Sequence, residues 1–286
     1  MKKILFLFLV TCQLAVAGTH DDGIVGFASY HDHGLQGVTG GMDGQIVHVS
    51  THDELVKYCK AAGAYTIVID KSITGHWVKG TGGAPSLLDE ISVTSDKTII
   101  AAGPEVVLDS ICFDIKNQQN IIFRNITLKH GKPDGIAFRS SHHVWLDHCD
   151  LSTCEDGLMD FTLGSSYCTV SWSAFHDHDK VSLSCSGTMH YEDVGKNRVS
   201  YHHNHYYNGT QRNPRIGYGL GHLWNNYWNH NEYQGSSSYC VGYFNWARVL
   251  VENSYFTDVK QPFQNMYGVY DYDSSWAQLE SRGNIF

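Results

Sequence analysis

The feature that most constrains the fold of this 286-residue chain is a pattern that recurs every 23 to 30 residues from residue 120 onward. Each copy is an alternating strand, a polar corner of Asn, Asp or His, and a short second strand that ends in Leu or an aromatic residue. The copies span residues 120–128, 143–151, 167–175, 197–206, 221–228 and 247–256. Because one such unit cannot bury its apolar side alone, a helix-free tandem array predicts a stacked solenoid.

We therefore expect an all-β fold, a right-handed parallel β-helix in which each coil pairs with its neighbours. A leucine-rich repeat would show an L-x-x-L-x-L motif, which this sequence lacks. A β-sandwich is the alternative, but the hairpin turns that it needs between strands, such as Asn-Gly and Asp-Gly, are scarce here. Asn side chains at recurring corners should form hydrogen-bonded ladders along the stack.

One helix and two short strands are predicted before the repeats. Thr51–Glu54 reads as a capping box, and Gly63 should end the helix. The apolar side of this capping helix holds Leu55, Cys59 and Ala62. The β-branched runs 66–70 and 97–101 predict strands.

The first residues predict export. A basic start at Met1–Lys3 precedes an apolar run, and Ala15–Ala17 supplies small residues at the spacing of a cleavage site. This run is too short to cross a bilayer about 30 Å thick as a helix, so residues 1–17 are interpreted as a signal peptide. A buried N-terminal strand is the alternative. We expect residues 18–286 to form a single secreted, extracellular domain.

Cysteine and histidine usage argues against a structural zinc site. Seven cysteines follow the predicted leader, so export permits disulfides, but an odd number leaves at least one thiol without an intramolecular partner. There is no C-x-x-C pair. The histidine-rich segments 176–179 and 202–205 are better explained as corner and strand positions, since alternate strand residues face opposite ways.

The net charge of −9, with His counted neutral, argues against a nucleic-acid partner. An acidic protein can bind an acidic substrate only through local cations or a metal ion. We expect a soluble monomer with neither nucleic-acid nor membrane partners.

Several motifs resemble those of polysaccharide lyase family 1, the pectate lyase superfamily. Val144–His148 (VWLDH) is similar to the family's V-W-[IV]-D-H signature. Other matching segments follow in the family's order, at 156–160, 169–172, 178–180, 201–204 and 212–215. The resemblance implies a secreted parallel β-helix enzyme that cleaves α-1,4-linked galacturonan (pectate) by calcium-assisted β-elimination. Its products would be 4,5-unsaturated oligogalacturonides, and its partner a pectin polysaccharide.

Three acids are candidate metal ligands: Asp134, Asp156 and Asp160. They lie near consecutive repeat units, and neighbouring coils of a solenoid are only about 4.8 Å apart, so the acids can converge. Converging carboxylates repel one another unless a cation lies among them, and oxygen ligands suit Ca²⁺ or Mg²⁺. The alternative is a set of solvated turn acids. The resemblance implies that these three positions bind calcium; Lys132 replaces a fourth Asp found in some family members.

The cations that an acidic polymer requires are Lys180, Arg212 and Arg215. An Arg can hold a carboxylate with two parallel hydrogen bonds, whereas Lys offers a point charge. Either could instead form a surface salt bridge. The resemblance implies that Arg212 is the catalytic base that takes the C5 proton, and that Lys180 binds substrate, with Arg215 fixing further carboxylate oxygens. Arginine ordinarily has a pKa above 12, so the assignment of the base rests on the resemblance alone.

One position departs from the family pattern. Many members read R-x-P-x-x-R, and the position of the second Arg is Gly217 here. We expect the carboxylate clamp to be incomplete and Gly217→Arg to improve it. The alternatives are a calcium-independent pectin lyase acting on esterified pectin and a weakly active or non-catalytic pectin-binding member. A galacturonan hydrolase with Asp156 and Asp160 as acid and base is a third.

Overall fold

The computed structural model describes residues 23–78, 87–88, 90–187, 190–266 and 276–286. The predicted signal peptide lies outside these residues. Within them, no helix is long and apolar enough to cross a membrane.

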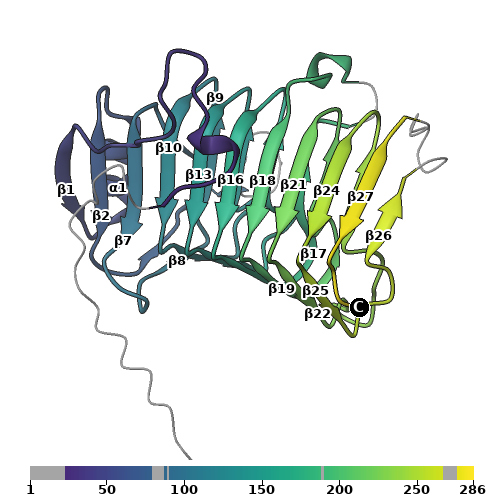
Figure 1. The fold of residues 1–286 in the computed structure, drawn as a ribbon. Coiled ribbons are helices and arrows are strands. Elements are labelled where there is room, and N and C mark those ends of the chain that lie inside the picture. Colours follow the sequence, from purple (N-terminus) through teal and green to yellow (C-terminus); the bar gives the residue numbers. More distant parts are fainter. Residues whose placement is uncertain (1–22, 79–86, 89, 188–189, 267–275) are drawn as a thin grey trace, which may run out of the picture.

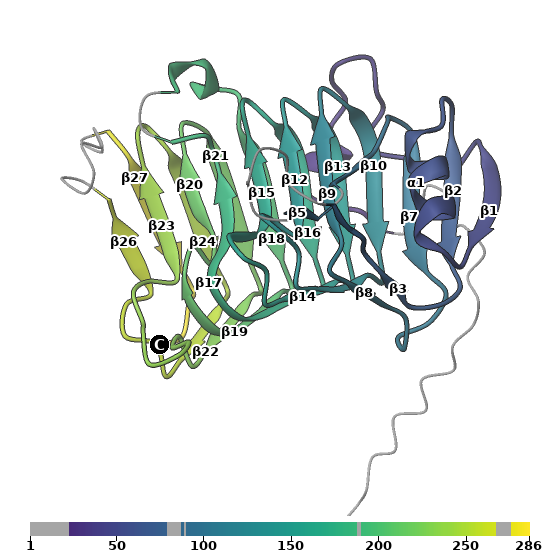
Figure 2. The ribbon, with the colours of Figure 1, turned by 180° about the vertical axis from the view of Figure 1, so that it is seen from behind.

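Parallel strands stack into two long sheets along the axis of a solenoid (Figures 1 and 2). The first sheet forms one face. Its strands, in spatial order, are β1 (Gln45–Val49), β2 (Tyr65–Ile69), β7 (Lys97–Ala101), β10 (Gln119–Arg124), β13 (His142–Asp147), β16 (Ser166–Ser171), β18 (Arg198–His202), β21 (Leu220–Trp224), β24 (Arg248–Glu252) and β27 (Gln278–Arg282).

The second sheet bends around the other two sides of the stack. One side consists of β3 (Ile73–Thr74), β8 (Val107–Asp109), β11 (Thr127–Lys129), β14 (Asp150–Ser152), β19 (His205–Gln211), β22 (Tyr227–Asn229) and β25 (Tyr255–Thr257). The other side, called the β12 face below, consists of β6 (Glu90–Ser92), β9 (Cys112–Lys116), β12 (Ile136–Arg139), β15 (Gly157–Thr162), β20 (Arg215–Gly217), β23 (Val241–Phe244) and β26 (Phe263–Asn265). The long strand β17 (Ala174–Ser184) pairs with strands of both sides and joins them. Three short elements lie outside these sheets: the 3₁₀ turns η1 (Phe27–Ser29) and η2 (Tyr191–Asp193), and an antiparallel pair, β4 (Trp77–Val78) with β5 (Leu87–Leu88).

The predicted all-β parallel β-helix is confirmed, and the predicted repeat corresponds to two of the three strands of each coil. Unit 143–151, for example, covers β13, a corner and β14. The corner contains a residue in the left-handed region, such as His148 at φ 53° and Asn225 at φ 54°. The third strand, on the β12 face, was not predicted.

The predicted capping box is present at the start of α1 (His52–Lys60). Thr51 Oγ1 accepts a hydrogen bond from Glu54 N, while Glu54 Oε2 accepts one from Thr51 N. Leu55 and Cys59 are buried in the core, and Figure 2 shows α1 at the end of the stack beside β1, β2 and β7. The helix ends earlier than predicted, because Ala61 is already extended, with φ −65° and ψ 140°; Ala62 lies beyond it and is exposed.

The predicted polar ladder runs through the corners, although serine and cysteine share it with asparagine. Cys149 N donates to Ser173 Oγ, Ser173 N to Asn204 Oδ1, and Asn204 N to the Oδ1 of Asn226. Each of these hydrogen bonds is 3.0 Å long and joins one coil to the next. All seven cysteines in the described part of the chain are buried and free. Burial raises the pKa of the Cys149 thiol to about 12, which makes it unreactive.

Candidate active site

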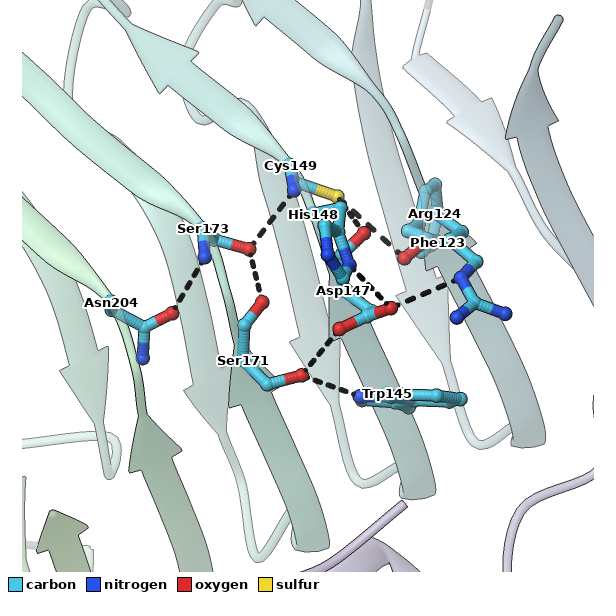
Figure 3. A network of polar contacts seen from close by, with 9 residues as sticks. All are labelled: Phe123, Arg124, Trp145, Asp147, His148, Cys149, Ser171, Ser173 and Asn204. Carbon is cyan, nitrogen blue, oxygen red and sulfur yellow. Dashed lines mark hydrogen bonds and ion pairs between the residues drawn. The ribbon is translucent and has the colours of Figure 1, made fainter. Parts of the chain in front are cut away.

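The VWLDH segment has a structural role, as Figure 3 shows. Asp147 is 1% exposed, and its carboxylate pairs with Arg124 Nε at 3.0 Å and with His148 Nδ1 at 2.8 Å. The carboxylate also accepts a hydrogen bond from Ser171 Oγ at 2.7 Å, and that oxygen in turn accepts one from Trp145 Nε1 at 2.8 Å. The network connects β10, β13 and β16, so this charge is fully satisfied by the protein.

The candidate chemistry lies on the β12 face, along one row of residues that crosses the strands. The register pairs Asp114 with Ala137, Ala137 with Asp160, Asp160 with Leu183, and Leu183 with Arg215. The neighbouring positions on these strands, among them Phe138 and Phe161, lie in the core. Since strand side chains alternate, this row faces outward.

Gly157 brings Asp134 and Asp160 together. Its backbone N–H donates to Asp134 Oδ1 at 2.8 Å. A Cβ atom at position 157 would lie 3.0 Å from Asp134 Oδ1 and 2.9 Å from Asp160 Oδ1. Both oxygens are therefore about 3 Å from one point and cannot be more than about 6 Å apart. A side chain at this position would push the two carboxylates apart.

The two carboxylates repel each other in a poorly solvated place. Burial, reinforced by the charge of Asp134, raises the pKa of Asp160 from 3.8 to about 7, although Leu183 N donates to its Oδ1 at 2.9 Å. Burial also raises the pKa of Asp134, and the charges of Asp156 and Glu90 add to this effect. The site thus has more negative charge than its own cations neutralise, as expected of a cation site.

Asp156 is the third predicted ligand, and it contacts Lys180 rather than the other two acids. Lys180 Nζ lies 2.7 Å from Asp156 Oδ1, and His178 Nε2 donates to the Asp156 carbonyl oxygen at 2.5 Å. Burial tends to raise the pKa of Asp156, but the hydrogen bond and the charge of Lys180 outweigh it and lower the pKa. The three acids are consequently not gathered as closely as a bound ion would hold them.

Arg212 faces all three acids from the segment between β19 and β20. Its backbone is left-handed, with φ 56°, and its carbonyl oxygen accepts a hydrogen bond from Ser182 N at 2.7 Å. Its positive charge lowers the pKa of Asp134, Asp156 and Asp160 alike. Its Nε is buried and has no hydrogen-bond partner among the described residues. The structure therefore brings the predicted catalytic arginine to the predicted metal ligands.

Arg215 and Gly217 have surroundings that the sequence did not indicate. Arg215 is 7% exposed, and its guanidinium lies 5.6 Å from the centre of the Phe244 ring. A Cβ at position 217 would meet that ring at 2.8 Å and Cys185 Sγ at 2.9 Å. Phe244 thus fills the space beside Gly217, and this packing argues against the expectation that Gly217→Arg would complete a clamp.

Sequence reasoning missed three charged residues of the β12 face: Asp114, which is part of this row, and Lys116 and Arg139, which lie two positions further along their strands. Asp114 is buried between Lys116, whose Nζ lies 2.5 Å from Asp114 Oδ2, and Arg139. Arg139 Nη2 also lies 3.9 Å from Asp134 Oδ2. The signal was present in the alternation of Cys112–Lys116, where an Asp between two core residues must face outward.

Comparisons of the sequence show the family. The family model described as "Pectate lyase" matches residues 4–269. The pectate trisaccharide-lyase of Thermotoga maritima is 38% identical over 239 residues, which cover 79% of this chain and 62% of that protein. Pectate lyase A of Emericella nidulans is 30% identical over 252 residues, or 84% of this chain and 71% of the relative. The chain thus matches less than two thirds of the length of the Thermotoga enzyme.

Solved structures share the fold. A Bacillus pectate lyase in complex with trigalacturonate superimposes with a TM-score of 0.74 at 26% identity, covering 92% of this chain and 87% of that one. The major allergen from cedar pollen gives a TM-score of 0.71 at 22% identity, covering 92% and 81%, and so shares the fold alone.

Proposed function

This chain belongs to the pectate lyase family, and we propose that it cleaves α-1,4-linked galacturonan by calcium-assisted β-elimination, giving 4,5-unsaturated oligogalacturonides. The observation that carries the proposal is the approach of Asp134 and Asp160 across Gly157, with Arg212 facing both acids. An uncompensated pair of carboxylates would repel a substrate that is itself a carboxylate. Such a substrate can bind beside the arginine only if a cation lies between it and the pair.

The donor set fits Ca²⁺. Asp134, Asp156 and Asp160 offer only carboxylate oxygens, which hard divalent cations prefer, and an added cation would offset the burial and the charge of Asp134 that raise the pKa of Asp160. These three residues would hold the ion. When bound, Ca²⁺ would neutralise the uronate carboxylate and so acidify the neighbouring C5–H bond.

Lys180 would bind a uronate carboxylate by exchanging its 2.7 Å contact with Asp156 for one with the substrate. The flexible stem of a lysine permits this exchange without movement of the strand. Arg215, fixed over Phe244 on the same row, would add its charge to the holding of substrate carboxylates.

Arg212, in its neutral form, would take the C5 proton on a guanidine nitrogen. The C5–H electrons then form the C4–C5 double bond, and the glycosidic oxygen leaves C4 with the bonding pair. The buried Nε of Arg212 lacks a hydrogen-bond partner among the described residues, which supports a side chain held for a group that comes from outside the protein.

The same proposal covers the setting of the enzyme. Residues 1–17 would direct export, and residues 18–286 would act outside the cell as one monomeric domain on pectin. The net charge of −9 makes binding to nucleic acid or to an anionic membrane unfavourable.

The test is incubation with polygalacturonate, with and without a calcium chelator, while the near-ultraviolet absorbance of the unsaturated product is followed. Product that forms only with calcium supports the proposal. Equal amounts of product with and without the chelator would show a calcium-independent pectin lyase. The case would be strongest if that product came from methyl-esterified pectin. New reducing ends without absorbance would show a hydrolase, and binding without product a non-catalytic protein.

A further inference from the structure

We propose that His52, Asp53 and His76 form a binding site for a transition-metal cation, with Zn²⁺ as the reference ion. One potential ligand atom from each residue lies within 4.8 Å of the other two. Asp53 Oδ1 lies 3.7 Å from His52 Nδ1, and the two imidazole rings are 4.2 Å apart between centroids. The site is at the N-terminal end of the stack, beside α1, and uses none of the residues of the β12 face.

The donor chemistry selects the class of ion. Two imidazole nitrogens and one carboxylate oxygen suit Zn²⁺, Co²⁺, Ni²⁺ or Cu²⁺, whereas Ca²⁺ prefers six to eight oxygen ligands. In a tetrahedral zinc site with bonds of about 2.0–2.1 Å, ligand atoms are about 3.3 Å apart. The ligand atoms, which lie within 4.8 Å of one another, would therefore need to approach by at most about 1.5 Å to close around an ion. His76 and Asp53 are exposed, so the ion can enter from solvent and water can complete its coordination.

Both histidines are held on well-fixed backbone. His52 is the first residue of α1, directly after the N-cap residue Thr51, and is 5% exposed. His76 follows β3, which pairs with β8, and Gly75 N donates to the carbonyl oxygen of Asp109 at 2.8 Å. A Cβ at Gly75 would lie 1.7 Å from the Ser110 carbonyl oxygen, so the chain before His76 is packed as closely as glycine allows. Such preorganisation lowers the entropic cost of gathering the ligands.

One effect opposes the site. The N-terminus of a helix carries partial positive charge, which disfavours a cation nearby. Asp53 and Glu54, both in the first turn of α1, supply negative charge at the same place and offset it. Asp53 is the ligand that distinguishes metal binding from simple stacking of the two rings, because stacking does not need its carboxylate.

A bound ion would fasten α1 to the segment between β3 and β4. Leu55 and Cys59 of α1 close the apolar core at this end, so the ion would resist opening of the first coils. Buried thiols do not compete for the ion, since burial raises the pKa of Cys59 to about 12.

The experiment titrates the full-length protein with Zn²⁺ by calorimetry in saturating calcium, which keeps the carboxylates of the β12 face occupied. We expect one site per chain. His76→Ala should weaken binding at least about tenfold, the lower limit for disturbing a metal site, and Asp53→Asn should also weaken it. His48→Ala is the matched control, because His48 is an exposed histidine near the same end that pairs with Asp70 at 2.8 Å.

Co²⁺ gives an independent readout, since tetrahedral coordination produces intense visible absorption that octahedral hydration does not. We expect this absorption in the wild type and His48→Ala, and its loss in His76→Ala. Activity on polygalacturonate should be the same in all of these variants, which checks that they fold. Absence of stoichiometric Zn²⁺ binding, or equal binding by wild type and His76→Ala, would overturn the proposal whatever the outcome for the lyase reaction.

Discussion

Replacing Asp160 by Asn should stabilise the calcium-free protein at alkaline pH while weakening its binding of calcium. Burial and the charge of Asp134 raise the pKa of Asp160 from 3.8 to about 7. Between these two pH values the folded protein keeps a proton on Asp160 that the unfolded chain has lost. The free energy of unfolding therefore falls as the pH rises through this window. Asn has no such proton to lose and keeps an oxygen that can accept from Leu183 N.

The size of the effect follows from the two pKa values. Each pH unit between 3.8 and about 7 corresponds to about 1.4 kcal/mol, which bounds the full effect at about 4 kcal/mol. The advantage of Asn over Asp should be near zero below pH 4, where both are neutral, and reach its maximum above pH 7. Between pH 5 and pH 8 it should grow by about 2–3 kcal/mol.

The assay is urea unfolding of wild type and Asp160→Asn in chelator at pH 5 and pH 8. Asp114→Asn is the control from the same row, since Lys116 and Arg139 already neutralise Asp114. That substitution removes a compensated charge and should destabilise the protein at both pH values. With calcium added, the wild type should gain more stability than Asp160→Asn. A difference between Asp160→Asn and wild type that does not change with pH would refute the idea that Asp134 and burial hold a proton on Asp160.

Four further outcomes are expected. Arg212→Lys should lower kcat at least about 10²-fold while the free energy of unfolding changes by less than about 1 kcal/mol; steady-state kinetics that match those of the exposed-site control Arg248→Lys would refute a catalytic role. Gly157→Ala should weaken calcium binding at least about tenfold, because its methyl group would lie within about 3 Å of two carboxylate oxygens, and a calcium titration that matches wild type would contradict this. Gly217→Arg should lower the melting temperature and give no gain on unesterified substrate, because Phe244 occupies the space; improved kcat/KM on polygalacturonate would show otherwise. Calcium affinity should weaken as the pH falls through about 7, since Asp160 takes up a proton that competes with the ion, and a flat affinity profile between pH 6 and pH 8 would count against Asp160 as a ligand.

The coil pattern was predictable because it is local. Alternation and a polar corner within nine residues predicted β13 and β14 to within one residue at each end. The third strand of each coil carries no such signal. In β15, Leu158 and Met159 are consecutive core residues, and the part of β17 beyond Phe175 opens with the polar stretch His176–Lys180. The pairing of these strands is decided by the coils above and below them, which no single segment of sequence contains.

The approach of Asp134 and Asp160 was predictable from coil spacing, but the charge balance of the three acids was not. Asp134 and Asp156 have different cations beside them in space. Arg139 lies 3.9 Å from Asp134, whereas Lys180 lies 2.7 Å from Asp156. Arg139 is 5 residues from Asp134 along the chain, and Lys180 is 24 residues from Asp156. Only the stacking of three-strand coils brings Lys180 and Asp156 together. The burial of Arg215 over Phe244 is likewise a contact between neighbouring coils that composition cannot reveal.

The cations that lie beside each acid of the β12 face identify the candidate site better than the number of acids does. Asp114 and Asp156 each have a lysine nitrogen within 2.7 Å, so each is compensated by the protein itself, whereas Asp134 has only Arg139 at 3.9 Å. Asp160 makes no ion pair with any described residue; Leu183 N and the more distant charge of Arg212 are what favour its ionised form. At neutral pH the protonated and ionised forms of Asp160 are therefore close in free energy, and an external cation would favour the ionised form. A divalent ion that displaces the proton would turn the surroundings of Arg212 and Lys180 from negative to positive, which is the change that an anionic sugar polymer needs in order to bind.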